Sequence, residues 1–246
     1  MADTVVPHRV AVYYVPSQQS AHWDFGCRWL GRDPVSGAAL DAHRVADIDP
    51  ARQGVIAQQA RRYGLHATLK PPFRLREGRT LADVDAALHA LATGMVPFDF
   101  TVELASLHRF LAWRPTTEDA AGQTAAVAAA CVRELDGLRA PPDEAELQRR
   151  RGAGLSERQD ALLQQWGYPY VMEEFRFHMT LTDALPTEEL AAVQASLAVA
   201  TRAFAEETLR FDALALFVEP SPGADFRYAA RYGFDGSVTR FAGWSS

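Results

Sequence analysis

The sequence has few cysteines, no long apolar run and no excess of positive charge, and each absence excludes a class of protein. Cys27 and Cys131 are too few in 246 residues for a disulfide scaffold, and they lack the spacing of metal ligands. We expect reduced, mostly buried thiols. No run of 18 or more apolar residues occurs, and the first residues lack the basic and apolar segments of a secretory signal. These absences predict a cytoplasmic protein without a membrane span.

The charge balance restricts the partners of the chain. A formal net charge of −6 provides no overall positive field for a long nucleic acid, but it permits a small phosphorylated ligand in a locally basic pocket. Apolar residues make up 48% of the chain, which is enough for a large packed core. We therefore expect a folded protein with a small phosphorylated substrate, with neither a long nucleic acid nor a membrane as partner. The oligomeric state stays open.

One short phrase occurs twice in the chain. Residues 65–69 read Leu-His-Ala-Thr-Leu, and residues 177–181 read Phe-His-Met-Thr-Leu. A β-strand would turn the histidine and the threonine of each phrase to one face and the apolar residues to the other. Two such strands side by side would bring together His66 with Thr68 and His178 with Thr180. The repeat therefore predicts a site with paired imidazoles.

The same alternation adds further polar groups to each face. Lys70 joins the face of the first phrase, while Arg176 and Thr182 join the face of the second. We expect Lys70 and Arg176 to neutralise a bound phosphate. Two aromatic residues near the phrases, Tyr63 and Tyr168, are candidates for the walls of the cleft.

Local patterns predict the order of elements along the chain. Strands are expected at 9–15, at the first histidine phrase up to Pro71-Pro72, and at 98–104, 110–113, 174–182, 209–218 and 226–234. Helices are expected at 52–63, 81–91 and 125–138, from Ser156 onward, and at 187–199. Between 22 and 49 the glycine, proline and aspartate content indicates a loop with at most a short helix.

The element order repeats, because each histidine strand is followed by a helix and two strands. An internal duplication predicts an α+β fold with two pseudo-symmetric lobes, each an antiparallel sheet with helices packed outside, around a central cleft. We expect one bilobal domain over residues 1–246, with lobe-forming halves at about 8–113 and 171–240. Residues from about 114 to 170 would form a helical connector, within which 140–165 is a connector or lid.

Paired imidazoles and hydroxyls suit acid–base chemistry on a phosphate. Opening a cyclic phosphodiester needs a base that activates water and an acid that protonates the departing oxygen, and two histidines provide both. The Thr68 and Thr180 hydroxyls would donate to the non-bridging oxygens, where negative charge grows. Which histidine is the acid and which is the base does not follow from the sequence.

The chain resembles the two-histidine (2H) phosphoesterases, which are defined by two His-x-Thr/Ser-hydrophobic phrases on equivalent strands of a duplicated α+β fold. Both phrases are intact, and the wording at 63–73 and 166–182 further resembles the branch encoded beside phosphonate-degradation (carbon-phosphorus lyase) genes. The resemblance implies hydrolysis of a small cyclic phosphodiester without a metal or other cofactor. A ribose cyclic phosphate from phosphonate breakdown is one attractive substrate.

Three other functions remain open on the sequence. A binding module would bind a nucleotide or sugar phosphate without turning it over, and the presence of both histidines and both threonines argues against it, since binding alone could use arginine or lysine. An RNA 2′,3′-cyclic phosphodiesterase or ligase is disfavoured by the acidic charge balance. A metal-dependent hydrolase with His66 and His178 as ligands is disfavoured because no carboxylate accompanies them at a recognisable ligand spacing.

Overall fold

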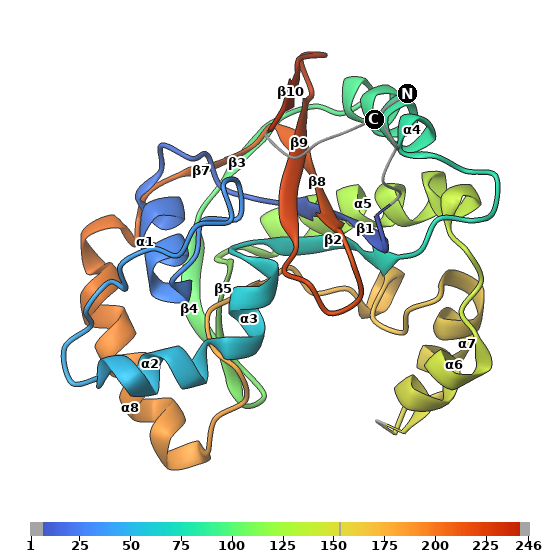
Figure 1. Ribbon diagram of the computed structural model, residues 1–246. Coiled ribbons are helices and arrows are strands. Elements are labelled where there is room, and N and C mark those ends of the chain that lie inside the picture. Colours follow the sequence, from blue (N-terminus) through green and yellow to red (C-terminus); the bar gives the residue numbers. More distant parts are fainter. Residues whose placement is uncertain (1–6, 153, 242–246) are drawn as a thin grey trace.

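An eight-stranded antiparallel sheet runs through the molecule in our computed structural model, which describes residues 7–152 and 154–241 (Figure 1). Its strand order is β10-β9-β8-β1-β2-β6-β5-β4. These strands are β10 (Val238–Arg240), β9 (Arg227–Gly233), β8 (Ala213–Glu219), β1 (Arg9–Tyr14), β2 (Ala67–Phe73), β6 (Met179–Thr180), β5 (Phe110–Pro115) and β4 (Val102–Leu107). A second sheet has two strands, β3 (Phe98–Phe100) and β7 (Leu209–Phe211). The predicted α+β class is confirmed.

The duplication is visible in the pairing of the strands. The first series runs β2, α4, β3, β4 and β5, and the second runs β6, α8, β7, β8 and β9. Equivalent strands pair with each other, β2 with β6 and β3 with β7. The β4–β5 hairpin of the first series adds to β6 of the second, while the β8–β9 hairpin adds to β1. The hairpin of each series therefore extends the sheet on the side of the other series. As a result, strands of both series belong to one continuous sheet.

Helices cover the sheet and flank its centre. The α-helices are α1 (Ala21–Leu30), α2 (Pro50–Ile56), α3 (Gln58–Tyr63), α4 (Leu81–Thr93), α5 (Glu118–Glu134), α6 (Glu144–Arg151), α7 (Glu157–Trp166) and α8 (Thr187–Thr201). Three short 3₁₀ turns are η1 (Asp136–Leu138), η2 (Met172–Glu174) and η3 (Arg202–Phe204). Helix α4 packs on β8 and β9, its counterpart α8 packs on β4 and β5, and α5 packs on β2.

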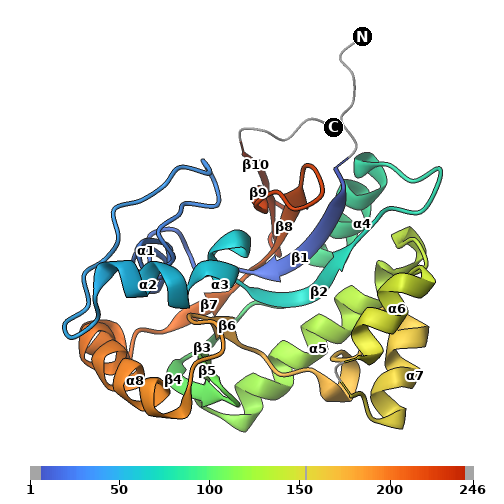
Figure 2. The same ribbon diagram turned by 60° about the horizontal axis from the view of Figure 1, so that its bottom comes forward.

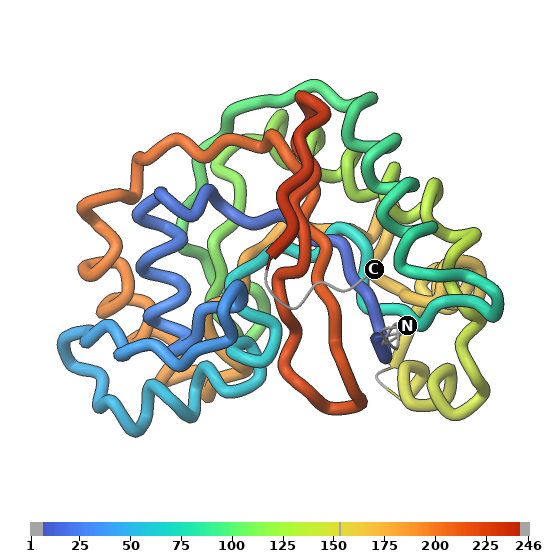
Figure 3. The backbone as a smooth tube through the Cα atoms, turned by 45° about the horizontal axis from the view of Figure 1, so that its top comes forward, coloured from blue at the N-terminus to red at the C-terminus, as the bar shows by residue number. Residues whose placement is uncertain are grey.

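The helices form two groups on either side of the central strands. Figure 2 shows α1, α2, α3 and α8 on one side and α4 to α7 on the other, and Figure 3 shows the β8–β9 hairpin (red) between them. An aromatic cluster fills the sheet face opposite the histidines. There Tyr14 lies 5.5 Å from Phe177 and 4.6 Å from Phe211, ring centre to ring centre. In the described part of the chain, no helix has the length and apolar character needed to cross a membrane.

Several predicted elements differ from the structure. The strands expected at 98–104 and 209–218 each divide into two, and the helix expected at 52–63 divides into α2 and α3. Residues 21–30 form the ten-residue helix α1 in the segment where at most a short helix was expected, because Ser20 caps its first turn and Gly31 ends it in the left-handed conformation. Strand β2 continues through Pro71 and Pro72, because its register with β1 shifts there and the missing N–H groups are tolerated at an irregular pairing. The second histidine strand is limited to Met179–Thr180, preceded by the turn η2.

Candidate functional site

The two histidine phrases lie side by side in the middle of the sheet. Strands β2 and β6 are antiparallel neighbours, and Ala67 pairs with Met179. This register places His66 opposite Thr180 and His178 opposite Thr68, all on one face. Opposite residues of an antiparallel pair have Cβ atoms about 5 Å apart, and diagonal neighbours are about 7–8 Å apart. The imidazoles are therefore diagonal neighbours, and each faces the hydroxyl of the other phrase.

Both imidazoles are held by the same backbone contact. The Nδ1 atom of His66 lies 2.9 Å from the carbonyl oxygen of Gly64, and the Nδ1 atom of His178 lies 2.7 Å from that of Arg176. A carbonyl oxygen only accepts, so Nδ1 carries the proton and donates it in both rings. In the neutral ring Nε2 is then an acceptor. The Nε2 atom of His66 accepts from the Thr68 hydroxyl at 3.2 Å.

Gly64 fits this contact for a conformational reason. Its φ of +76° lies in a region that residues with a side chain rarely adopt, and an added Cβ would come within 2.8 Å of the Pro34 side chain. The turn thus requires glycine, and it aims the Gly64 carbonyl at His66. Arg176, two residues before His178, provides the equivalent carbonyl without a glycine.

Burial keeps both rings neutral. Desolvation lowers the pKa of His66 to about 4. The hydrogen bond to Gly64 raises this pKa and partly offsets the effect, while the nearby His178 lowers it slightly further. Desolvation also lowers the pKa of His178, and the Arg114 guanidinium lowers it further. Arg114 stands opposite His178, because Trp113 pairs with Met179. Near neutral pH the free protein therefore presents uncharged imidazoles.

Two adjoining cavities open over this face. The first, about 520 Å³, is lined by His66, Thr68 and Thr180 together with Tyr63 and Tyr168. The second, about 580 Å³, is lined by His178, Arg176 and Thr68, and it shares Tyr168 with the first. Volumes of this size are typical of small-ligand sites. Both phrases thus contribute to one composite site.

Lys70 differs from its predicted position. The register of β2 with β1 shifts between Thr68 and Lys70, helix α5 covers the Lys70 side chain, and this side chain lines neither cavity. Its Nζ donates to the carbonyl of Val132 at 3.1 Å and lies 3.8 Å from a carboxylate oxygen of Asp136. Desolvation lowers the pKa of Lys70 to about 8. Lys70 ties β2 to α5 and does not contact the composite site.

Several lining residues escaped the sequence analysis. Tyr13 stacks on His66 at 4.0 Å between ring centres, and its hydroxyl, fully buried, has no protein partner within the described residues. Arg9 lines the first cavity from the start of β1. Arg150 reaches it from α6, with its guanidinium carbon 4.8 Å from the centre of the Tyr168 ring. Arg150 is the central residue of three consecutive arginines at 149–151, and only the fold shows that its side chain lines the cavity.

No metal centre accompanies the histidines. Over residues 7–152 and 154–241, no three histidine, cysteine, aspartate or glutamate side chains gather closely enough to hold a metal ion. Asp183 does line the first cavity, but its carboxylate accepts from the backbone N–H groups of Gln59 and Ala60 at the start of α3.

With this geometry established, comparison with known proteins gives the family. Residues 68–227 match the family described as "Protein of unknown function (DUF1045)", and the chain belongs to it. It is 38% identical over 239 residues to "Ribose 1,5-bisphosphate phosphokinase PhnN" of Janthinobacterium sp. (strain Marseille), covering 94% of this chain and 52% of the relative. It is 39% identical over 228 residues to the protein of that name from Laribacter hongkongensis (strain HLHK9), covering 89% of this chain and 50% of the relative. The chain spans about half the length of these curated relatives.

The relatives' names contradict the expected activity. The sequence predicted a hydrolase that opens a cyclic phosphodiester, whereas both relatives are named as kinases, which transfer a phosphoryl group. The error has a physical origin. Two imidazoles beside two hydroxyls indicate affinity for a phosphate, but this pattern does not specify which bond to phosphorus forms or breaks. The predicted phosphodiesterase activity is therefore withdrawn.

Proposed function

We propose that the composite site binds the phosphate end of a phosphorylated ribose. The cross-strand pairing of His66 with Thr180 and of His178 with Thr68 carries this proposal, because it brings two imidazoles and two hydroxyls to one sheet face, over two adjoining cavities that share Thr68 and Tyr168. The unpaired hydroxyl of Tyr13 adds a further donor at the wall. The ribose comes from the printed name of the relatives.

Positive charge at the rim supports an anionic ligand. Arg9 and Arg150 line the cavity of His66, and Arg176 lines that of His178. Guanidinium groups donate paired hydrogen bonds that match phosphate oxygens. Each Nε2 atom lacks a proton in the free protein, so donation from an imidazole to the phosphate requires protonation. Binding near neutral pH should therefore take up protons.

The sequence lacks a common nucleotide-binding loop, and this favours a sugar-phosphate site over a nucleotide site. Lys70 is the only lysine in the sequence and is followed by Pro71-Pro72, so no Gly-x-x-x-x-Gly-Lys-Ser/Thr loop occurs here. That loop holds the phosphates of a nucleoside triphosphate in one large class of phosphoryl-transfer proteins. We infer that this chain recognises and binds the phosphorylated ribose.

The resemblance stated on the sequence fits this proposal at the level of fold and family. We propose that the chain shares the duplicated architecture of the 2H phosphoesterases and a role in phosphonate breakdown. The pairing of equivalent strands, β2 with β6 and β3 with β7, supports the shared architecture.

Titration calorimetry with ribose 5-phosphate tests the binding proposal. We expect His66→Gln and His178→Gln each to weaken binding by about tenfold to a hundredfold, the range for loss of a charge-assisted hydrogen bond. His89→Gln, an exposed histidine on α4, is the matched control and should bind as wild type. Titrations in buffers of different ionisation enthalpy should show proton uptake that disappears in the double variant of His66 and His178.

Two results would overturn the proposal. Ribose 5-phosphate affinity that is unchanged in both histidine variants would place the sugar phosphate elsewhere. Formation of ADP by the pure chain from ATP, Mg²⁺ and ribose 1,5-bisphosphate would show a complete kinase, in agreement with the relatives' name, and not a recognition domain.

A further inference from the structure

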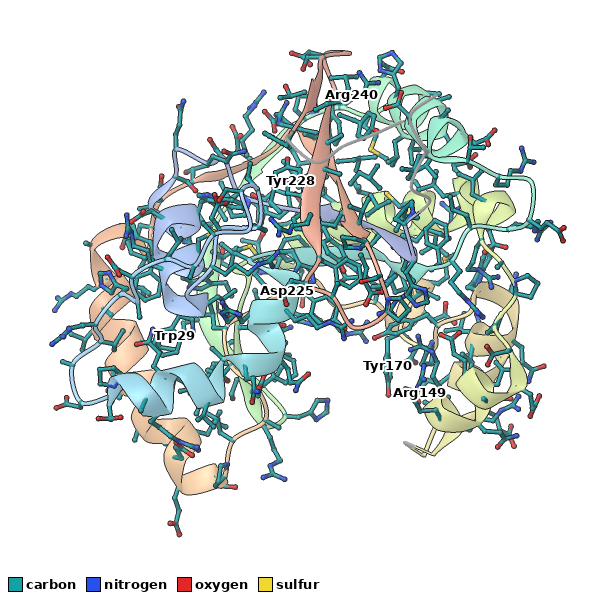
Figure 4. All side chains as sticks on the ribbon, viewed as in Figure 1. Trp29, Arg149, Tyr170, Asp225, Tyr228 and Arg240 are labelled. Atoms are coloured by element: carbon teal, nitrogen blue, oxygen red, sulfur yellow. The ribbon has the colours of Figure 1, made fainter. Side chains whose placement is uncertain are left out.

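A third cavity, whose lining includes four arginines and the carboxylates of Asp143 and Glu146, adjoins the site at Arg9. It measures about 370 Å³ and lies between the ends of β1 and β2 and helix α6. Arg9 and Pro72 line both this cavity and the cavity of His66. Arg74, Arg139 and Arg149 complete its basic wall. Figure 4 labels Arg149 on the side of the molecule that carries helices α6 and α7. We call this space the arginine cavity.

The carboxylates around the two cavities are outnumbered. Three of them are each shared by two cations. These pairings are Glu219 with Arg9 and Arg62, Asp136 with Lys70 and Arg139, and Glu146 with Arg149 and Arg150. Asp143 pairs with Arg74 alone. Among the side chains that line the two cavities, five are arginines (Arg9, Arg74, Arg139, Arg149 and Arg150) and three are carboxylates (Asp143, Glu146 and Asp183), in a chain whose overall charge is −6. Such a local surplus attracts an anion.

Arg9 is held in place between the two cavities. Its Nε donates to the carboxylate of Glu219 at 2.5 Å, and Glu219 is fully buried. The same carboxylate accepts from Arg62 and from the backbone N–H of Gly223 at 3.0 Å. The guanidinium carbon of Arg9 lies 5.6 Å from the centre of the Phe226 ring. These contacts fix Nε, while the guanidinium remains about a quarter exposed toward the cavities.

We propose that the arginine cavity is a second anion subsite, and that the ligand of this protein is a sugar carrying two separated phosphates. This inference rests on the proposed binding of a sugar phosphate. One phosphate occupies the composite site between the imidazoles, the second occupies the arginine cavity, and Arg9 lies between them. Three guanidinium groups come from different elements: Arg9 from β1, Arg139 from the end of η1 and Arg149 from α6. Together they are better suited to bind a phosphate dianion than to bind a neutral hydroxyl group.

The test compares a ligand with one phosphate and a ligand with two. Arg74 and Arg149 are suited to substitution because their side chains are 43% and 72% exposed and do not support the core. In the double variant Arg74→Gln/Arg149→Gln, we expect calorimetric affinity for ribose 1,5-bisphosphate to fall at least about tenfold. Affinity for ribose 5-phosphate should change less than about twofold. Arg210→Gln, which breaks a similarly exposed pair with Asp99, is the control.

The outcomes separate this inference from the proposed function. Loss of bisphosphate affinity alone in the arginine double variant supports the second subsite. Equal loss for both sugars would show a general field effect and would overturn it, as would no loss for either sugar. Failure of the histidine variants to weaken ribose 5-phosphate would instead count against the proposed function. A further titration uses ribose 5-phosphate together with inorganic phosphate. If this mixture gives the same proton uptake as the bisphosphate and the same loss of affinity in the arginine double variant, the two anions need not belong to one molecule. That result would overturn the assignment of a bisphosphate ligand.

Discussion

The two histidine phrases have nearly the same wording but different surroundings. Strand β2 has seven residues and pairs with β1 on one side and β6 on the other, whereas β6 has two residues. Beyond Thr180 the chain is held by backbone hydrogen bonds from Leu181 and Thr182 to the Leu111 carbonyl, and by side chains. Trp29 donates its indole N–H to the Leu181 carbonyl at 2.7 Å, and Thr182 accepts from the backbone N–H of Leu111 at 3.0 Å. A shared phrase thus does not produce a shared strand length.

The two imidazoles also differ in their surroundings. His66 stacks on Tyr13 and accepts from Thr68, so both of its ring nitrogens have protein partners. His178 lies 5.6 Å from the Phe110 ring and stands beside Arg114. The phrase therefore determines the bond of Nδ1 to the carbonyl two residues earlier, while neighbouring strands determine the surroundings of Nε2. Each experiment below tests one side of this comparison.

The largest expected effect is on stability at acid pH. The pKa of His66 is lowered from 6.5 to about 4 in the folded protein, so the unfolded chain binds the proton more readily. Above about pH 6.5, His66 does not change the free energy of unfolding with pH. As the pH falls from about 6.5 to about 4, His66 lowers the free energy of unfolding progressively, by about 3 kcal/mol in total. We expect His66→Gln to flatten the pH dependence of unfolding free energy in urea more than His178→Gln does. Equal flattening would show that the two rings have equivalent surroundings.

A smaller effect should distinguish the positions that follow each phrase. Lys70 and Thr182 are equivalent, but only Thr182 supports a neighbouring strand. Thr182→Val leaves the buried N–H of Leu111 without its acceptor, which should lower the free energy of unfolding by about 2 kcal/mol.

A second buried threonine provides the control for that measurement. The Thr201 hydroxyl donates to the Leu197 carbonyl within α8, and this carbonyl is already positioned for the helical bond. Thr201→Val should therefore stay within about 0.5 kcal/mol of wild type in urea unfolding. A cost for Thr182→Val no larger than for Thr201→Val would show that β6 does not depend on this side chain.

Local patterns predicted the element order well, because alternation and helical periodicity are properties of neighbouring residues. In both halves a histidine strand and a helix are followed by strands as predicted, although each half has three of these strands and not two. The sequence analysis allowed at most a short helix between 22 and 49, and helix α1 occupies residues 21–30, with Ser20 before it and Gly31 after it. The glycine and proline content of the residues that follow concealed its bounds.

The remaining differences depend on contacts between distant residues. Alternation places Lys70 on the face of His66, but it does not show that α5 covers that position. The exchange of hairpins between the two series depends on which strands pair, and no local pattern encodes this choice. Tyr13 and Arg9 reach the cavity for the same reason, since β1 becomes a wall only through its pairing with β2.

The smallest expected effect on stability concerns Tyr13, the ring that distinguishes the surroundings of His66 from those of His178. Its hydroxyl is buried and has no protein partner in the described ranges, so Tyr13→Phe removes an unsatisfied group and should leave stability unchanged or raise it by up to about 1 kcal/mol. Tyr232→Phe is the control, because the Tyr232 hydroxyl donates to Asp85 at 2.8 Å and its loss should lower stability by about 1 kcal/mol.

The same Tyr13 variant separates an idle hydroxyl from one that binds ligand. If the hydroxyl donates to the phosphate beside His66, Tyr13→Phe should weaken ribose 5-phosphate binding by about fivefold to tenfold while stability is maintained. Tyr232→Phe should show the opposite combination, with lower stability and unchanged affinity. Wild-type affinity in Tyr13→Phe would mean that Tyr13 serves only as the stacking partner of His66. The two histidine surroundings would then differ in packing and pKa but not in ligand contacts.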